Sequence, residues 1–460
     1  MYSQDKIKEL LDAGKLPTVD DVYAAPSKEI DDLVHVDLKK KKYITNNSSV
    51  EIVKHFDYKS KKIELNDFVA RFRNRYSYLK NIFYERADVT GMTSISKLTY
   101  GEDATIIAMI ADIRKLPTGN VRLVLEDLSG QVSAIITTKD PELAEKIPQL
   151  TYDEVLAFSG SHSGGVFFVN DIFWPDIPYK NKPKAPEDVY VVFCGDVHAG
   201  SNMFLPKEFT KFTEWLRGNY GTPDQREIAK KTKYVIVLGD VVDGVGIYPE
   251  QNKELRITDI YNQYDEAYQF LSQIPNDKQI IIIPGNHDAL RLAEPQPALY
   301  KEYAEKIYDL PNIIVTSNPS IVNLHKHDNF PGVDVMIYHG YSFDYFVDTV
   351  ESLRKAGGYD VADKIWEFLL KRRHLSPTYG ANPVMPNPID PLLIRHVPDI
   401  VCSGHIHKAK IGQYKGVVAV SGSCWQDTTT FQTRVGHTPT PGAVPIVNLK
   451  TWETNMLYFK

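Results

Sequence analysis

The chain has 460 residues, of which 43% are hydrophobic and 24% are charged, an ordinary globular composition that excludes a wholly disordered or fibrous protein. At roughly 150 residues per domain, this length predicts about three domains rather than one small module. The net charge of −6, from 53 basic and 59 acidic side chains, argues against nucleic-acid wrapping by charge alone.

Residues 1–90 are predicted to form a helical, polar N-terminal region. A helix is expected over 66–86, where Asn66 can serve as the N-cap and apolar residues recur at about helical spacing. Four consecutive lysines at 39–42 form a local basic run, which a solvated face explains most simply. The recurring apolar residues are Phe68, Phe72, Leu79 and Phe83.

Residues 91–175 are predicted to form an OB barrel. Three β-forming segments, a short helix and two further β-forming segments follow one another here, which is the element order of that fold. Asp140 and Pro141 are a favourable N-cap and first residue for the helix. An OB barrel can bind single-stranded nucleic acid or dock to a protein, and the sequence leaves both open. The strands are predicted at 104–113, 121–126, 132–137, 154–161 and 166–173.

Residues 176–187 are predicted to be an extended linker, because three prolines and three lysines alternate within them. Residues 188–460 then alternate strand-like apolar runs with helical stretches, which predicts an α/β domain. The apolar runs lie at 189–193, 234–238, 279–283, 333–338, 399–402 and 417–420.

Five polar segments each follow a predicted strand of this last region. Ligand sites of open α/β sheets lie outside the carboxyl ends of strands, so we expect the five segments to meet. Any one of them alone is typical of an ordinary loop, but five in one order are hard to explain that way. Their carboxylates, imidazoles and single amide suit Mn²⁺, Fe or Zn²⁺ better than Ca²⁺. The segments are G-D-V-H at 195–198, G-D-V-V-D-G at 239–244, G-N-H-D at 285–288, Y-H-G at 338–340 and G-H-I-H at 404–407.

This order of segments resembles the calcineurin-like metallophosphoesterase superfamily over about 188–425. The resemblance implies a four-layer β-sandwich flanked by helices, with two divalent metal ions. Mn²⁺ is the first choice, and Mg²⁺, Fe and Zn²⁺ are alternatives. One ion would be held by Asp196, His198 and His407. The other would be held by Asn286, His339 and His405. Asp240 would bridge the two ions.

The resemblance also implies that His287 is a catalytic acid beside the leaving group, and that Asp243 and Asp288 orient imidazoles or loops. Two departures argue against a protein phosphatase. Gly244 stands where Ser/Thr phosphatases of the superfamily carry a phosphate-clamping arginine, and Asp288 stands where they carry glutamate. A diester has one charge per phosphate and needs such a clamp less.

The layout of the whole chain resembles the small subunits of archaeal family D DNA polymerases over about 65–460. Similar segments include FVARFRNRYSYLKNIFYERADV at 68–89, R-R-H-L-S-P at 372–377 and G-H-T-P-T-P-G at 436–442. The resemblance implies a proofreading 3′–5′ exonuclease that acts on the primer 3′ end and releases 5′-mononucleotides. Its partner would be the large catalytic subunit of a heterodimeric polymerase.

Two other functions stay open at this point. The first is a non-enzymatic assembly or scaffold subunit of the polymerase, which the complete set of ligand positions disfavours. The second is a free-standing phosphodiesterase acting on small nucleotides, which the barrel and the basic N-terminal helix disfavour.

Arg372, Arg373 and His374 are candidate DNA contacts. They lie between the fourth and fifth segments, in a loop bounded by proline, and we expect them to reach DNA phosphates near the metal ions. A surface cluster of salt bridges is the competing interpretation.

The sequence predicts a cytoplasmic protein without membrane association. No apolar run approaches the ~20 residues that cross a bilayer, and the first residues, MYSQDKIKELL, lack the apolar stretch of a secretory signal. The three cysteines, Cys194, Cys402 and Cys424, give no disulfide framework in a chain of this length.

Overall fold

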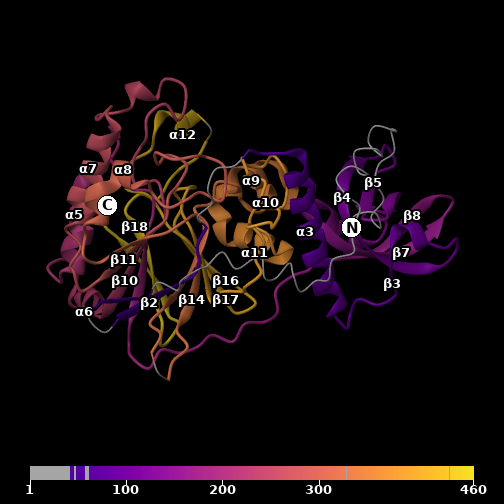
Figure 1. Ribbon diagram of the computed structural model, residues 1–460, viewed down its shortest axis with the longest axis horizontal. Coiled ribbons are helices and arrows are strands. Elements are labelled where there is room, and N and C mark those ends of the chain that lie inside the picture. The colour runs from indigo at the N-terminus through magenta and orange to yellow at the C-terminus, as the bar shows by residue number, and fades with distance from the viewer. Residues whose placement is uncertain (1–41, 46–47, 57–61, 328, 435) are drawn as a thin grey trace. The chain divides into compact units, whose positions relative to one another are not determined.

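The computed structural model describes residues 42–45, 48–56, 62–327, 329–434 and 436–460, which fall into two compact units (Figure 1). The first unit contains Ile63–Pro175 and the short segment Pro386–Asp390. The second contains the described residues of Lys40–Lys62, together with Asp176–Met385 and Pro391–Lys460. Most of the lysine run at 39–42 lies outside the described residues.

The first unit is built around a closed barrel, as the sequence predicts. Its sheet has the order β3-β4-β5-β6-β8-β7, and β4 also pairs with β7, which closes the ring. Helix α4 (Pro141–Lys146) lies between β6 and β7, and the Asp140 side chain caps it by accepting from the backbone N–H of Glu142 and Leu143. The strands are β3 (Met92–Thr93), β4 (Asp103–Lys115), β5 (Val121–Asp127), β6 (Gly130–Ile136), β7 (Val155–Ser163) and β8 (Val166–Phe173).

Helix α3 (Leu65–Tyr84) packs on the barrel through one face. Leu79 and Phe83 are buried, and the hydroxyl of Tyr76 donates to the carbonyl of Ile107 at 2.9 Å. The predicted cap is wrong by two residues. Glu64 is the N-cap, its backbone N–H donates to Asp67 at 3.1 Å, and Asn66 lies inside the first turn. The capping box that Glu64 forms with Asp67 starts the helix earlier.

A buried ion triad lies in the same unit. Arg71 and Arg75 project from α3 to Asp390, at 3.1 and 2.8 Å. The side chains of the three residues are at most 3% exposed. Both guanidinium groups therefore depend on the carboxylate of Asp390, because a buried charge without its partner raises the free energy of the fold.

The second unit is a four-layer sandwich, as the resemblance implies (Figure 1). Its two sheets enclose one hydrophobic core. One sheet has the order β12-β11-β10-β9-β18-β19, and the other has the order β1-β2-β13-β14-β15-β17-β16. The first sheet comprises β9 (Tyr190–Cys194), β10 (Thr232–Val237), β11 (Gln279–Ile282), β12 (Ile313–Val315), β18 (Ala443–Asn448) and β19 (Thr454–Tyr458). The second comprises β1 (Lys42–Thr45), β2 (Ser48–Lys54), β13 (Ser320–Leu324), β14 (Val333–Ile337), β15 (Ile400–Ser403), β16 (Lys410–Tyr414) and β17 (Val417–Ser421).

Helices cover the outer faces of both sheets and form a further core on each side. The β9–β12 side carries α5 (Pro206–Leu216), α6 (Pro223–Lys231), α7 (Ile260–Leu271) and α8 (Lys301–Tyr308). The β13–β17 side carries α9 (Phe343–Thr349), α10 (Glu351–Ala356) and α11 (Ala362–Arg372). Helix α12 is Thr430–Arg434, and short 3₁₀ turns are η2 (Ile95–Lys97), η3 (Ile147–Gln149), η4 (Gln251–Lys253) and η5 (Gly358–Val361). No helix in the described ranges is long and apolar enough to span a bilayer.

Two segments differ from the sequence-based expectation. The region 1–90, expected to be helical, contributes strand β2, which pairs antiparallel with β13 and buries Val50 and Ile52 in the core between the sheets. Its partner lies far away along the chain, so a local pattern gave little sign of it. The expected linker at 176–187 runs along the second unit: Ala185 N–H donates to the carbonyl of Leu449 at 3.0 Å.

We expect Asp390→Asn to destabilise the barrel unit by about 3 kcal/mol, because it removes the negative charge that two buried guanidinium groups share. Urea unfolding of the full chain, followed by hydrogen exchange of peptides from the barrel unit, would measure it. Asp88→Asn is the matched control: Asp88 also pairs with an arginine, Arg86, but its side chain is 61% exposed, so the cost should stay under about 1 kcal/mol. Equal effects of the two changes would contradict the role given to the triad.

Candidate active site

The structure brings the five polar segments together at the carboxyl ends of strands. They follow β9, β10 and β11 of one sheet and β14 and β15 of the other. The seven predicted metal ligands and His287 therefore come from both sheets and converge near one cavity of about 750 Å³. The predicted residues that line it are His198, Asp240, Asp243, His287, His405 and His407.

Five of the seven predicted ligands have a left-handed backbone, a conformation that costs non-glycine residues energy. Such strain persists where the surrounding structure holds it, and it gathers at functional sites. The five residues and their φ angles are Asp196 (36°), His198 (52°), Asp240 (47°), His405 (66°) and His407 (52°).

Asp196, His198 and His407 form one group. Nε2 of His198 lies 3.0 Å from Nε2 of His407, and the latter lies 3.7 Å from Oδ1 of Asp196. All three side chains are at least nine-tenths buried. Two imidazole nitrogens this close, beside a carboxylate, form a donor set that one cation can satisfy.

Asn286, His339 and His405 form a second group. The amide oxygen of Asn286 lies 2.9 Å from Nε2 of His339 and 2.9 Å from Nδ1 of His405. Asp240 stands between the groups, because its Oδ2 is 3.8 Å from Nε2 of His198 and 3.3 Å from Nε2 of His339. The two groups thus share one carboxylate.

The backbone approaches this centre closely, and one glycine makes that approach feasible. A Cβ on Gly285 would lie 2.2 Å from Oδ1 of Asp240. Any side chain there would push the central carboxylate aside, so the glycine before Asn286 is a geometric requirement of the site.

Burial and mutual charge set the protonation states of the centre. Burial raises the pKa of Asp196 well above its ordinary value, and the Asp240 carboxylate adds to the rise. Burial also opposes ionisation of Asp240, but His339 and other imidazoles lower its pKa well below the ordinary value. Burial opposes protonation of His339, yet Asp240 raises the pKa of that imidazole to about 10. Burial lowers the pKa of His407 well below its ordinary value, which leaves it neutral.

His287 is anchored at two points beside the first group. Its backbone N–H donates to Oδ1 of Asp240 at 2.8 Å, and its Nδ1 lies 2.7 Å from the carbonyl oxygen of Asp243. Because a carbonyl oxygen only accepts hydrogen bonds, Nδ1 must carry a hydrogen and donate it to that oxygen. The other ring nitrogen, Nε2, is then available to interact with a bound ligand. The ring packs edge-on against His198, with centroids 4.8 Å apart.

A layer of partners holds the predicted ligands in place. Oδ1 of Asp243 lies 2.9 Å from Nδ1 of His198, which agrees with the orienting role expected of it. The backbone carbonyl of Leu238 lies 2.8 Å from Nδ1 of His339. Each of these contacts leaves the opposite ring nitrogen facing the centre, as second partners of metal-binding histidines do.

Two such partners were missed by the sequence reasoning. Asp344 lies 2.9 Å from Nε2 of His405, and the side-chain amide of Gln432 lies 2.8 Å from Nδ1 of His407. Both come from helices, α9 and α12, rather than from a strand end, and neither stands in a recognisable motif. Only the fold reveals them.

Asp288 and Glu294 form buried acidic supports behind the centre. Asp288 accepts from the backbone N–H of Gly285 at 2.8 Å and of Val241 at 3.2 Å, so it holds loops, as expected. Burial raises the pKa of Asp288 to about 7. Glu294, which the sequence did not single out, accepts from the Tyr338 hydroxyl at 3.0 Å. Burial raises the pKa of Glu294 to about 7 as well.

The candidate DNA contacts at 372–374 are placed differently from the expectation. Arg372, Arg373 and His374 are 2%, 6% and 1% exposed. Arg372 donates to the carbonyl of Phe368 at 3.0 Å, and Arg373 donates to that of Ile394 at 2.8 Å. The two arginines thus satisfy carbonyl groups inside the unit, and Nδ1 of His374 accepts from the backbone N–H of Ser376 at 2.9 Å, so these buried side chains are not available to a phosphate at the surface.

Comparisons with known proteins fit this arrangement. A family model for calcineurin-like phosphoesterases matches residues 189–409. Proteins named DNA polymerase II small subunit from Methanothermobacter thermautotrophicus, Pyrococcus abyssi and Archaeoglobus fulgidus are 40%, 39% and 38% identical to this chain. The alignments cover 84%, 87% and 83% of this chain, and 78%, 64% and 74% of those proteins.

Glu294 predicts a pH dependence of stability. Its pKa of about 7 in the fold exceeds the ordinary 4.5, so the folded chain binds a proton that the unfolded chain has lost. The contribution of Glu294 to the free energy of unfolding is therefore largest below pH 4.5. It falls by about 3 kcal/mol as the pH rises through 7.

Glutamine does not ionise, so Glu294→Gln should remove the pH dependence that Glu294 causes. The Tm of this variant should therefore fall less between pH 5 and pH 8 than the Tm of the wild type. Thermal melts in EDTA measure the two slopes. Glu250→Gln, at a side chain that is 69% exposed, is the control and should keep the wild-type slope. A Glu294→Gln variant with the wild-type slope would show that Glu294 is ionised in the fold.

Proposed function

The chain belongs to the family of archaeal DNA polymerase II small subunits, those of the family D polymerases, and we propose that it is the polymerase's 3′–5′ exonuclease. The proposed reaction hydrolyses the 3′-terminal phosphodiester of a primer and releases a 5′-mononucleotide. One observation carries the proposal: seven candidate ligands and a candidate acid converge at one cavity.

The residues of the centre fit two divalent cations, as the metallophosphoesterase family implies. Asp196 and Asp240 are fully buried, and in the described part of the chain their ion-pair partners are histidines, with no Lys or Arg among them. Buried carboxylates need counter-charge. Asp240 raises the pKa of His339 to about 10, which supports a demand for positive charge beside this carboxylate.

We assign Asp196, His198 and His407 to one ion, Asn286, His339 and His405 to the other, and Asp240 to both. When bound, two such ions supply an activated water and neutralise charge on the phosphate oxygens. Mixed N and O donors suit Mn²⁺, with Mg²⁺, Fe and Zn²⁺ as alternatives.

His287 is the proposed general acid. Its ring is fixed through Nδ1 by the Asp243 carbonyl, so a proton on Nε2 can pass to the departing 3′-oxygen of the penultimate sugar. The hydrogen bond from its backbone N–H to Asp240 ties the loop that carries His287 to the centre, which supports this role. Asp243 thus positions both His198, through its carboxylate, and His287, through its carbonyl.

Gly244 supports a diester rather than a phosphoprotein as the substrate. A Cβ at this position would lie 2.3 Å from the carbonyl oxygen of His287. An arginine that clamps a phosphate dianion therefore has no room there in this structure. The cavity also offers one arginine, Arg354, among its described lining residues, which matches a substrate with a single charge per phosphate.

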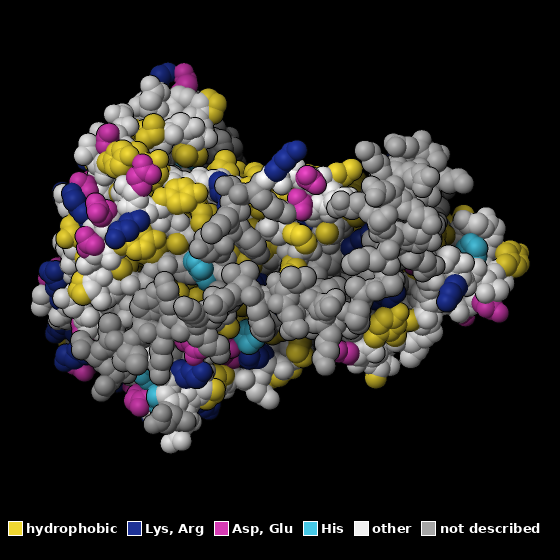
Figure 2. Space-filling model, viewed as in Figure 1, with side chains coloured by type: hydrophobic (Ala, Val, Ile, Leu, Met, Phe, Trp, Pro, Cys, Tyr) yellow, Lys and Arg dark blue, Asp and Glu magenta, His cyan; other side chains and the backbone are white. Residues whose placement is uncertain are grey.

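We propose that the large catalytic subunit supplies most of the affinity for DNA. The net charge of this chain is −6. Among the side chains coloured in Figure 2, Lys and Arg are interspersed with Asp and Glu and form no single basic stripe. Affinity for nucleic acid depends on such basic surfaces. A heterodimer that delivers the primer end to this cavity accounts for a nuclease with so mixed a surface.

The first experiment follows a 5′-labelled primer with a mismatched 3′ end, incubated with metal-stripped protein resupplied with Mn²⁺, alone and with the large subunit. We expect a ladder that shortens from the 3′ end. Asp240→Asn and His287→Ala should each lower the rate by at least about 100-fold. His396→Ala removes an exposed histidine outside the site and should cleave like the wild type.

No cleavage by the wild type, alone or with the large subunit, would favour the assembly subunit over the exonuclease. A ladder that persists in Asp240→Asn would overturn the assignment of that carboxylate while leaving the activity in place.

Gly244→Ala should lower the rate of cleavage by about 100-fold, because the new methyl group displaces His287 by about 1 Å. Gly246→Ala is the matched control. Gly246 has a similar φ, 77° against 74°, but a Cβ there meets no atom within 4 Å. Backbone strain is thus similar, and the two variants differ in what the new methyl group meets, which at Gly244 is the carbonyl oxygen of His287 at 2.3 Å and the side chain of Ile247 at 2.8 Å. Similar rates for the two variants would contradict this role of Gly244.

A further inference from the structure

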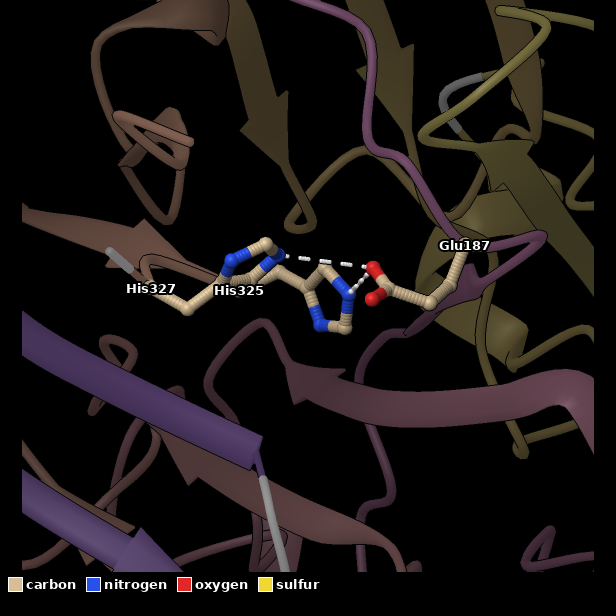
Figure 3. A group of neighbouring side chains, drawn as sticks. All are labelled: Glu187, His325 and His327. Atoms are coloured by element: carbon tan, nitrogen blue, oxygen red, sulfur yellow. Dashed lines mark hydrogen bonds and ion pairs between the residues drawn. The ribbon is translucent and has the colours of Figure 1, made fainter. Parts of the chain in front are cut away.

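A second cluster of ligand-type side chains lies outside the cavity just described. Glu187 comes from the segment before β9, and His325 and His327 lie directly after β13. Figure 3 shows both imidazole rings facing the carboxylate of Glu187. Oε2 of Glu187 lies 2.9 Å from Nε2 of His325 and 3.4 Å from Nε2 of His327. None of the three residues lines the cavity.

We propose that Glu187, His325 and His327 form a binding site for one Zn²⁺ ion. Two imidazoles and one carboxylate are a donor set that zinc accepts in proteins, with a fourth position left for water. This site is independent of the proposed nuclease function.

The separations suit such an ion. Bonds of about 2.0–2.2 Å in a tetrahedral arrangement place ligand atoms about 3.3–3.5 Å apart. The two oxygen–nitrogen distances are 2.9 and 3.4 Å, and all three ligand atoms lie within 4.8 Å of one another. Movements of the side chains by about 1 Å therefore complete the site without moving the backbone.

His325 is held ready for this role. The hydroxyl of buried Tyr234 lies 3.0 Å from its Nδ1, which leaves Nε2 facing Glu187. Metal-binding histidines commonly have such a partner on the second ring nitrogen, which fixes the tautomer and the ring orientation. His325 also has a left-handed backbone, with φ of 65°, in common with five of the candidate ligands of the active site.

The exposure of the cluster provides access for an ion. The side chain of His325 is 9% exposed, whereas those of His327 and Glu187 are 41% and 60% exposed. His325 is thus held by the core, whereas His327 and Glu187 lie at the surface, where an ion can reach them. The His325 contact lowers the pKa of Glu187, so its carboxylate stays ionised at neutral pH. An ion bound here would tie the segment before β9 to the end of β13.

The test measures the number of Zn²⁺ ions bound to the full chain, by equilibrium dialysis and elemental analysis. We expect His327→Ala and Glu187→Gln each to bind one ion fewer than the wild type. Tyr234→Phe should bind this ion about 10–100-fold more weakly, since the outer partner of His325 is lost. Co²⁺ in place of Zn²⁺ should give a visible absorption band that His327→Ala lacks.

His396→Ala is the matched control. His396 is also exposed and contacts a carboxylate, Asp334, at 2.7 Å, but it belongs to no group of three ligands in the described chain. It should keep the wild-type stoichiometry. Asp240→Asn should also keep this ion, so the result does not depend on the nuclease. Equal numbers and affinities of Zn²⁺ for the wild type, His327→Ala and Glu187→Gln would overturn the proposal.

Discussion

The active site of the second unit is built around two buried carboxyl groups, Asp196 and Asp240, placed where the carboxyl ends of both sheets meet. Neither has a Lys or Arg in an ion pair among the described residues, so the imidazoles beside them supply the opposing charge. The surrounding features follow from that constraint. Strained backbone at the ligands, a glycine pressed against Asp240, and buried hydrogen-bond partners on the outer ring nitrogens all keep donors directed at one point.

The barrel, the α/β character of the second unit and the meeting of the five segments could be predicted from local patterns, whereas the four-layer sandwich was implied only by the family resemblance. Strand segments show either alternating apolar and polar residues or a continuous apolar run. Turns contain glycine, and the polar segments of the site directly follow the strands. Strand β2 was not predicted, since its pairing with β13 joins distant parts of the chain. Asp344 and Gln432 were not predicted either, because their distance from His405 and His407 is set by tertiary packing alone.

The error at 372–374 has a different physical origin. Two adjacent arginines and a histidine are usually exposed, which made them candidates for phosphate contacts. In the fold, Arg373 ends α11 with a left-handed backbone and donates to the carbonyls of Ile394 and Arg395. Its guanidinium group satisfies carbonyl groups where no regular element pairs with them. Arginine therefore serves here as an internal cross-link, a use that a charge pattern does not reveal.

The pairing of β2 with β13 has a consequence for how the chain folds. The sequence of the barrel unit, Ile63–Pro175, is inserted between β2 and the rest of the second unit. During synthesis the barrel strands emerge together and pair with near neighbours, whereas β2 waits until Ser320–Leu324 has been made. Contacts between such distant segments form slowly. The barrel is thus available as an early folding unit, and the sheet that carries His339 and His405 is completed late.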